Sequence, residues 1–393
     1  MEHLYEDLYN YNPWWEEEFK PELIVREKFL KILRSSERRK EILIITGLRR
    51  VGKSSLMKLF IKELAERVEP KKILYVSLDS IAIEKISVQD LVREFRKLHQ
   101  FRRNEKIYLF FDEAAYRENI NQELKTLYDN ENVKIYVSSS SATILRDKNS
   151  LLTGRSKIVE VLPLDFFEFL SFKNFAVKKS EDYLTEKYFE EFMMKGGIPE
   201  YILSDDFEYL DNLVDAIIYK DIAFYHGVKD ITSLKEFFRL LMERAGKQAS
   251  LTKISKVMGI SSETAKRYFE YFQNTYLIYA IERCGKLNER LRAPKKVFAA
   301  DLGIKNMVTG FRDKGAVFEN LVYFLIKEHS PCYIYKDGIE LDFHFNKTLI
   351  EVKYNREIDN KQRMLFDKLN IERKILVANV KDFLKLQSEI GKR

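Results

Sequence analysis

The sequence is short of the residues that build disulfide frameworks and zinc sites. Its 393 residues include two cysteines, Cys284 and Cys332, which lie far apart and outside any Cys/His spacing typical of a metal site. Disulfides belong mainly to oxidising compartments, and zinc sites need closely spaced ligands. We therefore expect no disulfide framework and no structural zinc, and we predict a cytoplasmic protein.

Long apolar runs are missing as well. The segment 1–19 is acidic and lacks a basic stretch followed by an apolar one, so it does not resemble a signal peptide. No apolar run approaches the ~20 residues that are needed to cross a bilayer. These absences predict a protein that does not enter a membrane.

The chain does contain enough apolar sequence for several cores. A length of 393 residues exceeds one average domain and predicts about two to four of them. The formal net charge of +7 is a mild basic bias, which suits nucleic acid and an acidic partner equally. Charge alone therefore does not choose a partner.

Apolar patterns divide the chain into four parts. In the first part, short β-rich runs alternate with helical patterns, which is typical of a parallel sheet. The second part has aromatic-rich helical periodicity, interrupted at Gly196, Gly197 and Pro199. We predict an α/β multidomain chain that consists of a parallel-sheet domain in 1–165, a helical lid in 166–240, a winged helix-turn-helix in 241–300 and a C-terminal α/β domain in 301–393.

The third part has the spacing of a helix-turn-helix. An apolar face runs from Leu251 to Met258, Gly259 ends the helix, and Ser261 can cap the next one. Two strand-like runs follow, 277–284 and 295–301, and a basic loop joins them. We expect this loop to form a wing.

The strongest motif is "GLRRVGKSS", which matches G-x-x-x-x-G-K-[ST] between an apolar strand and a helical pattern. In this context, backbone N–H groups of the loop and of the helix N-terminus converge on phosphate oxygens. We expect Lys53 to reach the β- and γ-phosphates of ATP and Ser54 to bind Mg²⁺. The expected cradle consists of Gly47, Leu48, Arg49, Arg50, Val51, Gly52, Lys53, Ser54 and Ser55.

A second motif, "LFFDEA", ends an apolar strand with Asp112 and Glu113. We place these acids at the carboxyl end of a strand that neighbours the phosphate-binding loop, where Mg²⁺ must be held. The next carboxylate can then polarise the attacking water. We predict that Asp112 binds Mg²⁺ and that Glu113 is the general base, so the chain hydrolyses ATP.

Other side chains are candidates to complete this site. Four serines, residues 138–141, end the next strand; one hydroxyl could contact the γ-phosphate, although a serine run also suits a turn. Arg49, Arg50 and Arg155 are candidates for stabilising phosphate charge. Arg155 would act either in its own subunit or in a neighbour's, which would require a homo-oligomer.

A separate group of charges lies in "IELDFHFNKTLIEVKY", residues 339–354. Both halves alternate with the period of a strand, and we take Asn346-Lys347 as a two-residue turn. This register sets Asp342 opposite Glu351. Like charges that face each other across two strands are destabilising, so the pair needs compensation.

Two sources of compensation are open. A divalent cation between Asp342 and Glu351, or the Lys353 ammonium, would offset the repulsion. The alternative is a solvated polar face on which Glu340 forms an ion pair with Lys353.

These motifs together resemble a known group, the archaeal and bacterial P-loop ATPases that are related to AAA+ and STAND proteins and carry a C-terminal restriction-endonuclease-like, or PD-(D/E)XK, domain. The resemblance covers nearly the whole chain. It rests on "NPWW", "GLRRVGKSS", "LFFDE", "LTGR" followed by "LPLDFFEFL", "GGIPE" and the ending "FEN…LDF…EVKYN". It implies an AAA-type ATPase domain in 1–165 and a nuclease-like domain in 301–393.

The resemblance also implies a second catalytic set. Glu319 matches the helical acid of such nucleases, Asp342 the acid of the second strand, and Glu351 and Lys353 the E-x-K of the third. In these enzymes the carboxylates, here Asp342 and Glu351, hold Mg²⁺ or Mn²⁺, and the lysine supports the phosphorane.

Two function hypotheses follow. In the first, the chain is an ATP-hydrolysing enzyme that acts on nucleic acid, most naturally DNA, and cuts it with the C-terminal domain. The basic residues that would grip DNA are Lys266, Arg267, Arg290, Arg292, Lys295 and Lys296. In the alternative, the chain is a nucleotide-controlled switch or scaffold whose nuclease-like domain is inactive.

Overall fold

The computed structural model describes residues 2–117, 119–142, 151–175 and 182–390. These residues form two compact units. The first contains residues 1–162 and 274–276, and the second contains residues 163–273 and 277–393. The predicted boundaries at 240 and 300 fall inside the second unit, and the division into four domains stays a prediction.

The first unit is built on a parallel sheet of five strands in the order β2-β3-β4-β1-β5. All side chains of β1, β3 and β4 are buried, which explains why these strands are almost continuously apolar. The strands are β1 Ile42–Thr46, β2 Ile73–Ser77, β3 Ile107–Asp112, β4 Val133–Ser139 and β5 Ser156–Glu160.

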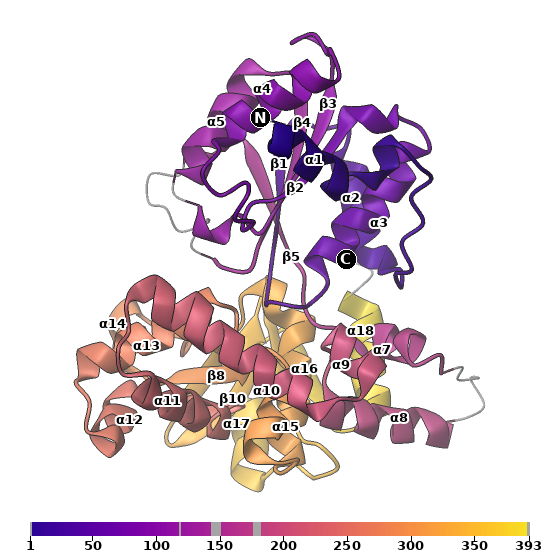
Figure 1. Cartoon of the computed structure of the whole chain (residues 1–393). Coiled ribbons are helices and arrows are strands. Elements are labelled where there is room, and N and C mark those ends of the chain that lie inside the picture. The colour runs from indigo at the N-terminus through magenta and orange to yellow at the C-terminus, as the bar shows by residue number, and fades with distance from the viewer. Residues whose placement is uncertain (1, 118, 143–150, 176–181, 391–393) are drawn as a thin grey trace. The chain divides into compact units, whose positions relative to one another are not determined.

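Helices lie on both sides of this sheet, with α4 and α5 on one side and α2 and α3 on the other (Figure 1). The N-terminal segment packs against β2, where the indole N–H groups of Trp14 and Trp15 both donate to the carbonyl of Ile73, at 3.1 and 2.8 Å. The helices are α1 Glu2–Tyr11, α2 Glu27–Ser36, α3 Lys53–Ala65, α4 Val88–Leu98 and α5 Ile120–Asn130, with short 3₁₀ turns at Pro13–Trp15, Pro70–Lys72 and Ala114–Tyr116.

The second unit begins with helices, as the periodicity of 166–240 predicts. Pro199 starts a helix directly after the Gly196-Gly197 break. The last turns of one long helix wind as a π-helix, Ile217–Phe224. The helices are α7 Phe166–Phe172, α8 Asp182–Lys195, α9 Pro199–Ser204, α10 Phe207–Ala216 and α11 Ile231–Glu243.

A helix pair and a small sheet follow. Helix α12, Leu251–Met258, ends at Gly259 in the left-handed conformation, and the Ser261 hydroxyl accepts from the Thr264 N–H at 3.0 Å at the start of α13, Ser262–Asn274. The sheet has the order β6-β8-β7. Its strands are β6 Lys247–Ala249, β7 Ile278–Ile281 and β8 Lys295–Ala299, and the short helix α14 Leu287–Arg292 lies in the predicted wing.

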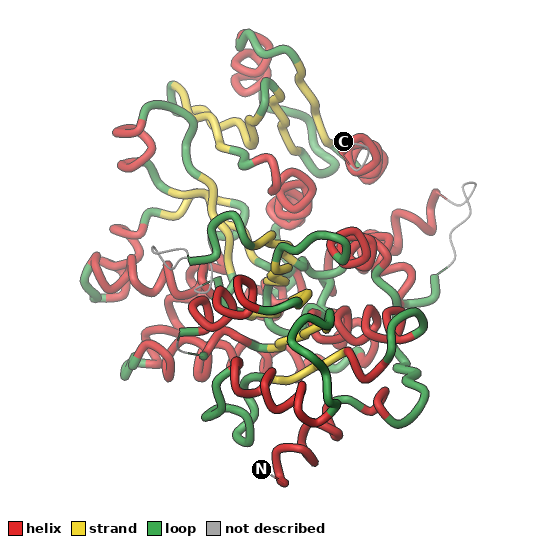
Figure 2. Tube along the Cα trace, turned by 90° about the horizontal axis from the view of Figure 1, so that it is seen from above, coloured by secondary structure: helices red, strands yellow, loops and turns green. Residues whose placement is uncertain are grey.

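The C-terminal part is a four-stranded sheet in the order β12-β11-β10-β9 with helices packed against it. Figure 2 shows the helices and strands of both units from a second direction. The elements are α15 Leu302–Thr309, α16 Lys314–Ile326, a 3₁₀ turn Lys327–His329, β9 Cys332–Lys336, β10 Ile339–Phe345, β11 Thr348–Val352, α17 Asn360–Lys368, β12 Arg373–Val377 and α18 Val380–Ile390. Among the described residues, no helix is both long and apolar enough to cross a membrane.

The prediction for the cysteines is wrong, because Cys284 and Cys332 form a disulfide with a Cα–Cα distance of 5.2 Å. The chain after β7 runs beside β9, where the Cys284 N–H donates to the Tyr333 carbonyl at 2.7 Å. The disulfide joins residues that are 48 positions apart, so sequence spacing could not reveal it. His344 lies beside both sulfur atoms, but bonded sulfurs offer no thiolate to a metal ion. The cytoplasmic location, which rested partly on unpaired cysteines, stays a prediction.

We expect Cys332→Ser to lower the free energy of unfolding by about 2–4 kcal/mol, because a cross-link over 48 residues restricts the unfolded chain. Urea unfolding of the wild type and the variant, both without reductant, measures this difference. The wild type in reductant is the control and should match the variant. A wild-type midpoint that reductant leaves unchanged would contradict the assignment.

Candidate functional site

The loop between β1 and α3 has the backbone of a phosphate cradle. Gly47, Arg50 and Gly52 have φ angles of +133°, +68° and +96°. A Cβ atom on Gly47 would lie 2.2 Å from the carbonyl oxygen of Val161, so only glycine fits there. The first turn of α3 leaves N–H groups without helical partners at the end of this loop.

Lys53 is buried at the first position of α3 and turns back into the loop. Its Nζ donates to the carbonyls of Gly47 and Leu48, each at 2.8 Å. These two carbonyl oxygens are neutral, so a phosphate group that replaces them gives the ammonium a charged partner. Of the other predicted cradle residues, Leu48 and Val51 are buried, Arg49 and Ser55 are half-buried, and Arg50 and Ser54 are exposed.

Arg26 also contacts the loop. It is not among the site residues that the sequence predicts. Its guanidinium is buried and donates to the carbonyl of Val51 at 2.9 Å and to that of Leu162 at 3.0 Å. Arg26 thus ties the cradle to the chain that leaves β5. No local pattern marks this residue, because both partners are distant backbone atoms.

Asp112 and Glu113 lie at the carboxyl end of β3. Strand β4 pairs with both β1 and β3 and lies between them, so the two acids reach the phosphate-binding loop from the second strand along the sheet, and their role at this loop stays a prediction. Asp112 is buried and accepts from the Tyr75 hydroxyl at 2.5 Å and from the Glu113 N–H at 3.1 Å. Both donors are neutral groups.

Glu113 has a left-handed backbone, with φ of +51°. Such a conformation is uncommon for glutamate and directs the side chain to one place. Burial raises the pKa of Glu113 above its ordinary value, while Lys53 and a hydrogen bond from Ser140 oppose the rise. This carboxylate is therefore a better proton acceptor than an ordinary surface glutamate.

The intervening strand explains the serine run. The Ser138 hydroxyl bonds to Asp112 and accepts from the Glu113 N–H at 3.0 Å, while the Ser140 hydroxyl donates to the Glu113 carboxylate. Ser139 instead bonds with Ser141 at 2.7 Å. Alternate serines of β4 and the residues after it thus hold the two acids.

Arg155 points elsewhere in this structure. Its guanidinium donates to Asp129 at 2.9 Å and lies over the Tyr128 ring, 5.8 Å from the ring centre. A role for Arg155 at a nucleotide stays a prediction.

In the second unit, the strands β10 and β11 pair in the register that the sequence predicts. Phe343 faces Ile350 and Phe345 faces Thr348, and Asn346-Lys347 forms the turn with positive φ angles of +41° and +63°. Asp342 and Glu351 meet directly beyond these pairs: the Asp342 N–H donates to the Glu351 Oε2 at 3.2 Å, and the Val352 N–H donates to the Asp342 Oδ2 at 2.9 Å.

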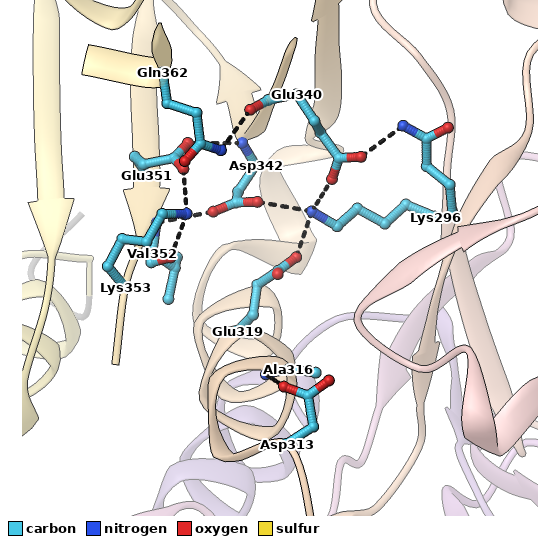
Figure 3. Close-up of polar contacts among 11 residues, drawn as sticks. Lys296, Asp313, Ala316, Glu319, Glu340, Asp342, Glu351, Val352, Lys353 and Gln362 are labelled. Carbon is cyan, nitrogen blue, oxygen red and sulfur yellow. Dashed lines mark hydrogen bonds and ion pairs between the residues drawn. The ribbon is translucent and has the colours of Figure 1, made fainter. Parts of the chain in front are cut away.

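Lys296 occupies the middle of this acidic group (Figure 3). Its Nζ lies 2.6 Å from Glu319 Oε1, 2.5 Å from Glu340 Oε1 and 2.8 Å from Asp342 Oδ1. The prediction that Lys296 grips DNA from the wing is wrong, because its side chain is 1% exposed. Its strand places Lys296 on the face that packs against the C-terminal sheet.

Lys353 offsets the negative charge of Glu351, the other acid of the Asp342/Glu351 pair. Its Nζ lies 2.6 Å from Glu351 Oε1. The alternative ion pair between Glu340 and Lys353 is therefore wrong, since Glu340 binds Lys296 and Lys353 binds Glu351.

Burial and mutual repulsion shift the pKa values of the group. Burial, and then Asp342, raises the pKa of Glu351 to about 8 against the opposing effect of Lys353, and burial and Asp342 also raise the pKa of Glu319. Burial lowers the pKa of Lys296, but Asp342, Glu319 and Glu340 outweigh burial and raise it. Lys296 is therefore charged, and the excess negative charge is relieved most easily by protonating Glu351 or Glu319.

The other predicted DNA-gripping residues lie nearer the surface. Arg290 and Lys295 form ion pairs with Glu282, at 2.5 and 2.8 Å. The exposed ones are Lys266, Arg267, Arg290 and Arg292.

Comparisons with known proteins bear on both units. Residues 39–170 match a family described as an AAA domain, and residues 186–315 match a domain of unknown function, DUF8612. An uncharacterized protein of Methanocaldococcus jannaschii is 29% identical over 379 residues, which cover 88% of this chain and 84% of the relative. An uncharacterized protein of Haemophilus influenzae is 28% identical over 342 residues, 82% of this chain and 83% of the relative.

Two solved structures show a low similarity to this chain. A Walker-type ATPase of Pyrococcus abyssi is 17% identical with a TM-score of 0.46, and the match covers 75% of this chain and 99% of that one. The ORC1 protein of Aeropyrum pernix, solved in complex with DNA, is 12% identical with a TM-score of 0.35, covering 76% and 96%. Likenesses at this level carry no functional argument. Residues 39–170 are thus similar to an AAA domain, and they contain the five parallel strands and the glycine-rich loop described above.

Proposed function

We propose that this protein binds and hydrolyses ATP and works as a nucleotide-controlled switch. One observation carries the proposal: the loop after β1 leads into Lys53 at the start of α3, Asp112 and Glu113 lie at the carboxyl end of β3, and Ser138 of β4 and Ser140 just after it bond to these two acids. The carboxyl ends of parallel strands meet at one edge of a sheet, which is where such folds bind ligands.

The residues of the loop suit ATP and Mg²⁺. Backbone N–H groups of residues 47–55 and the Lys53 ammonium would hold the phosphates, and Ser54 and Asp112 would hold Mg²⁺. The ion would neutralise phosphate charge. Glu113, with its raised pKa, would accept a proton from the attacking water.

Arg155 is a candidate to contact a phosphate in its own chain or in a neighbour's. Its bond to Asp129 keeps the guanidinium occupied within its own chain. In a homo-oligomer, a neighbour's phosphate could compete for it.

We propose nucleic acid, DNA in the first instance, as the partner. The support is the group of exposed basic side chains on α13 and α14. Lys296 of β8 does not belong to this group, because it is buried. Lys266 and Arg267 share α13, and Arg292 ends α14.

For the nuclease-like domain we adopt the inactive alternative. Glu319, Asp342, Glu351 and Lys353 do lie together, which favours a relationship to PD-(D/E)XK enzymes. The acids, however, are already paired with Lys296 and Lys353. Labelled DNA incubated with Mg²⁺ or Mn²⁺ should therefore stay intact, and cleavage that Asp342→Ala abolishes would restore the enzyme hypothesis.

Two variants separate ATP binding from ATP hydrolysis. We expect Lys53→Ala to weaken ATP binding about 10–100-fold, because it removes a charged hydrogen-bond donor to phosphate. We expect Glu113→Gln to bind ATP normally and to hydrolyse it about 10²–10⁴-fold more slowly, because it removes the general base. Fluorescent-nucleotide titration and phosphate release measure the two effects.

Lys62→Ala is the matched control, because Lys62 is an exposed lysine of the same helix. It should behave as the wild type in both assays. Normal hydrolysis by Glu113→Gln would remove Glu113 from the proposed role.

The Ser140 hydroxyl should set the pH dependence of hydrolysis. Its hydrogen bond lowers the pKa of Glu113, so Ser140→Ala should raise that pKa further. A base with a higher pKa stays protonated to higher pH, and the acid limb of the kcat profile should move upward in pH. Ser139→Ala, whose hydroxyl bonds to Ser141, is the control and should leave the limb in place. A shift shared by both variants would argue against a specific effect on Glu113.

DNA binding should depend on the exposed basic residues. Replacing Lys266, Arg267 and Arg292 by alanine should reduce the slope of log affinity against log salt by about 0.9 for each lost phosphate contact. Fluorescence anisotropy with a labelled duplex at several salt concentrations measures this slope.

A control with equal charge change replaces Arg38, Arg39 and Lys40, which are exposed residues of the first unit. It should keep the wild-type slope. Equal slopes for all three proteins would exclude α13 and α14 as the DNA-binding surface.

A further inference from the structure

The Nζ atom of Lys296 has the surroundings of a bound metal ion. Oxygens of Glu319, Glu340 and Asp342 converge on it at 2.5–2.8 Å. Hard divalent cations in proteins bind carboxylate oxygens at about 2.0–2.6 Å. The three acids come from α16 and β10, so the chain assembles a three-carboxylate pocket and then fills it with its own ammonium (Figure 3).

We propose that Lys296 is the resident cation of this site and excludes Mg²⁺ and Mn²⁺ from it. The inference deepens the proposed function, on which it rests for the inactive role of the nuclease-like domain, because it supplies the reason for that inactivity. It also predicts that the pocket becomes a divalent-cation site when the ammonium is removed.

The three-stranded sheet delivers a second side chain to the pocket. Gln248 of β6 lies opposite Lys296 of β8 in the sheet. Its Nε2 donates to Glu340 Oε2 at 2.5 Å, while Lys296 lies 2.5 Å from Glu340 Oε1. Both oxygens of Glu340 thus bond to neighbouring side chains of one sheet. We call these two side chains, Gln248 and Lys296, the plug.

The plug is fixed in place by contacts around Lys296. The Asn320 side chain accepts from the Ala299 N–H at 2.8 Å and donates to the Ala299 carbonyl at 3.0 Å. The Phe298 ring stacks on Tyr323 with ring centres 4.2 Å apart. These contacts hold the part of β8 that follows Lys296, and the Lys296 side chain is buried, so it differs from a surface lysine that is free to move.

Lysine side chains also contact the two acids of the other possible metal position, which lies between Asp342 and Glu351. Asp342 Oδ1 accepts from Lys296 at 2.8 Å, and Glu351 Oε1 lies 2.6 Å from the Lys353 ammonium. A divalent ion between these acids would lie beside two ammonium groups, that of the buried Lys296 and that of the half-buried Lys353. Repulsion between like charges at such distances is strong where water is excluded.

Mn²⁺ binding to the full-length, nucleotide-free protein tests the proposal. The free Mn²⁺ signal in electron paramagnetic resonance gives the number of ions bound per chain. We expect Lys296→Met to bind ~1 more Mn²⁺ per chain than the wild type. The extra ion should be lost in the double variant Lys296→Met/Asp342→Asn.

Lys295→Met is the matched control, since Lys295 precedes Lys296 on β8 but pairs with Glu282. It should bind Mn²⁺ as the wild type does. A folded Lys296→Met protein that gains no ion would overturn the proposal.

A second comparison holds even if Lys296→Met fails to fold. The wild type and Asp342→Asn should give the same Mn²⁺ isotherm, because the wild-type pocket holds no metal. A wild type that loses a bound Mn²⁺ on Asp342→Asn would show that the acids bind metal despite Lys296. None of these measurements involves ATP, so failure of the proposed ATPase activity would leave their outcome unchanged.

Discussion

The second unit depends on one buried charge, the Lys296 ammonium, and on the three carboxylates that surround it. A buried ion pair with one partner removed costs about 3–5 kcal/mol, since the remaining charge is left without compensation. The lysine comes from the three-stranded sheet and the acids from the C-terminal part. If the two parts separated from each other, the lysine and the acids would lose their charged partners. This constraint, together with the disulfide between Cys284 and Cys332, explains why the second unit includes both.

Two of the buried lysines, Lys53 and Lys296, illustrate opposite uses of the same side chain. Lys53 is held by two neutral carbonyls, and a phosphate that binds there gains a charged partner at the cost of weaker ones. Lys296 is held by three carboxylates, and a metal ion that competes with it must break three charged contacts. The first arrangement leaves a site open to an anion, whereas the second closes a site to a cation. The groups around each lysine, more than the lysine itself, decide whether ligand binding is favourable.

Local patterns predicted the parts of both sites that lie on one strand, one turn or one loop. The glycine-rich loop gives Lys53 its place, and the alternation in residues 339–354 with the Asn346-Lys347 turn gives the pairing of Asp342 with Glu351. Contacts between distant segments were out of reach: Arg26 with Val51, Cys284 with Cys332, and β4 between β1 and β3. Each of these depends on how whole elements pack, for which a single sequence carries no local signal.

Lys296 is an intermediate case, because the alternation of β8 carries a signal for it. With period two, Lys296 shares a face with Phe298, and Lys295 shares the other with Val297. One of the two adjacent lysines must lie on the same face as Phe298, which packs against the Tyr323 ring. A charge on that face needs acidic partners. Glu319, Glu340 and Asp342 are acids in excess on apolar elements elsewhere in the chain, and they need a cation in turn. A lysine on the buried face of one strand therefore indicates acids on the buried faces of other elements, and such acids indicate a lysine. This complementarity is the sequence signal that places Lys296 inside the protein and not on a DNA-binding wing.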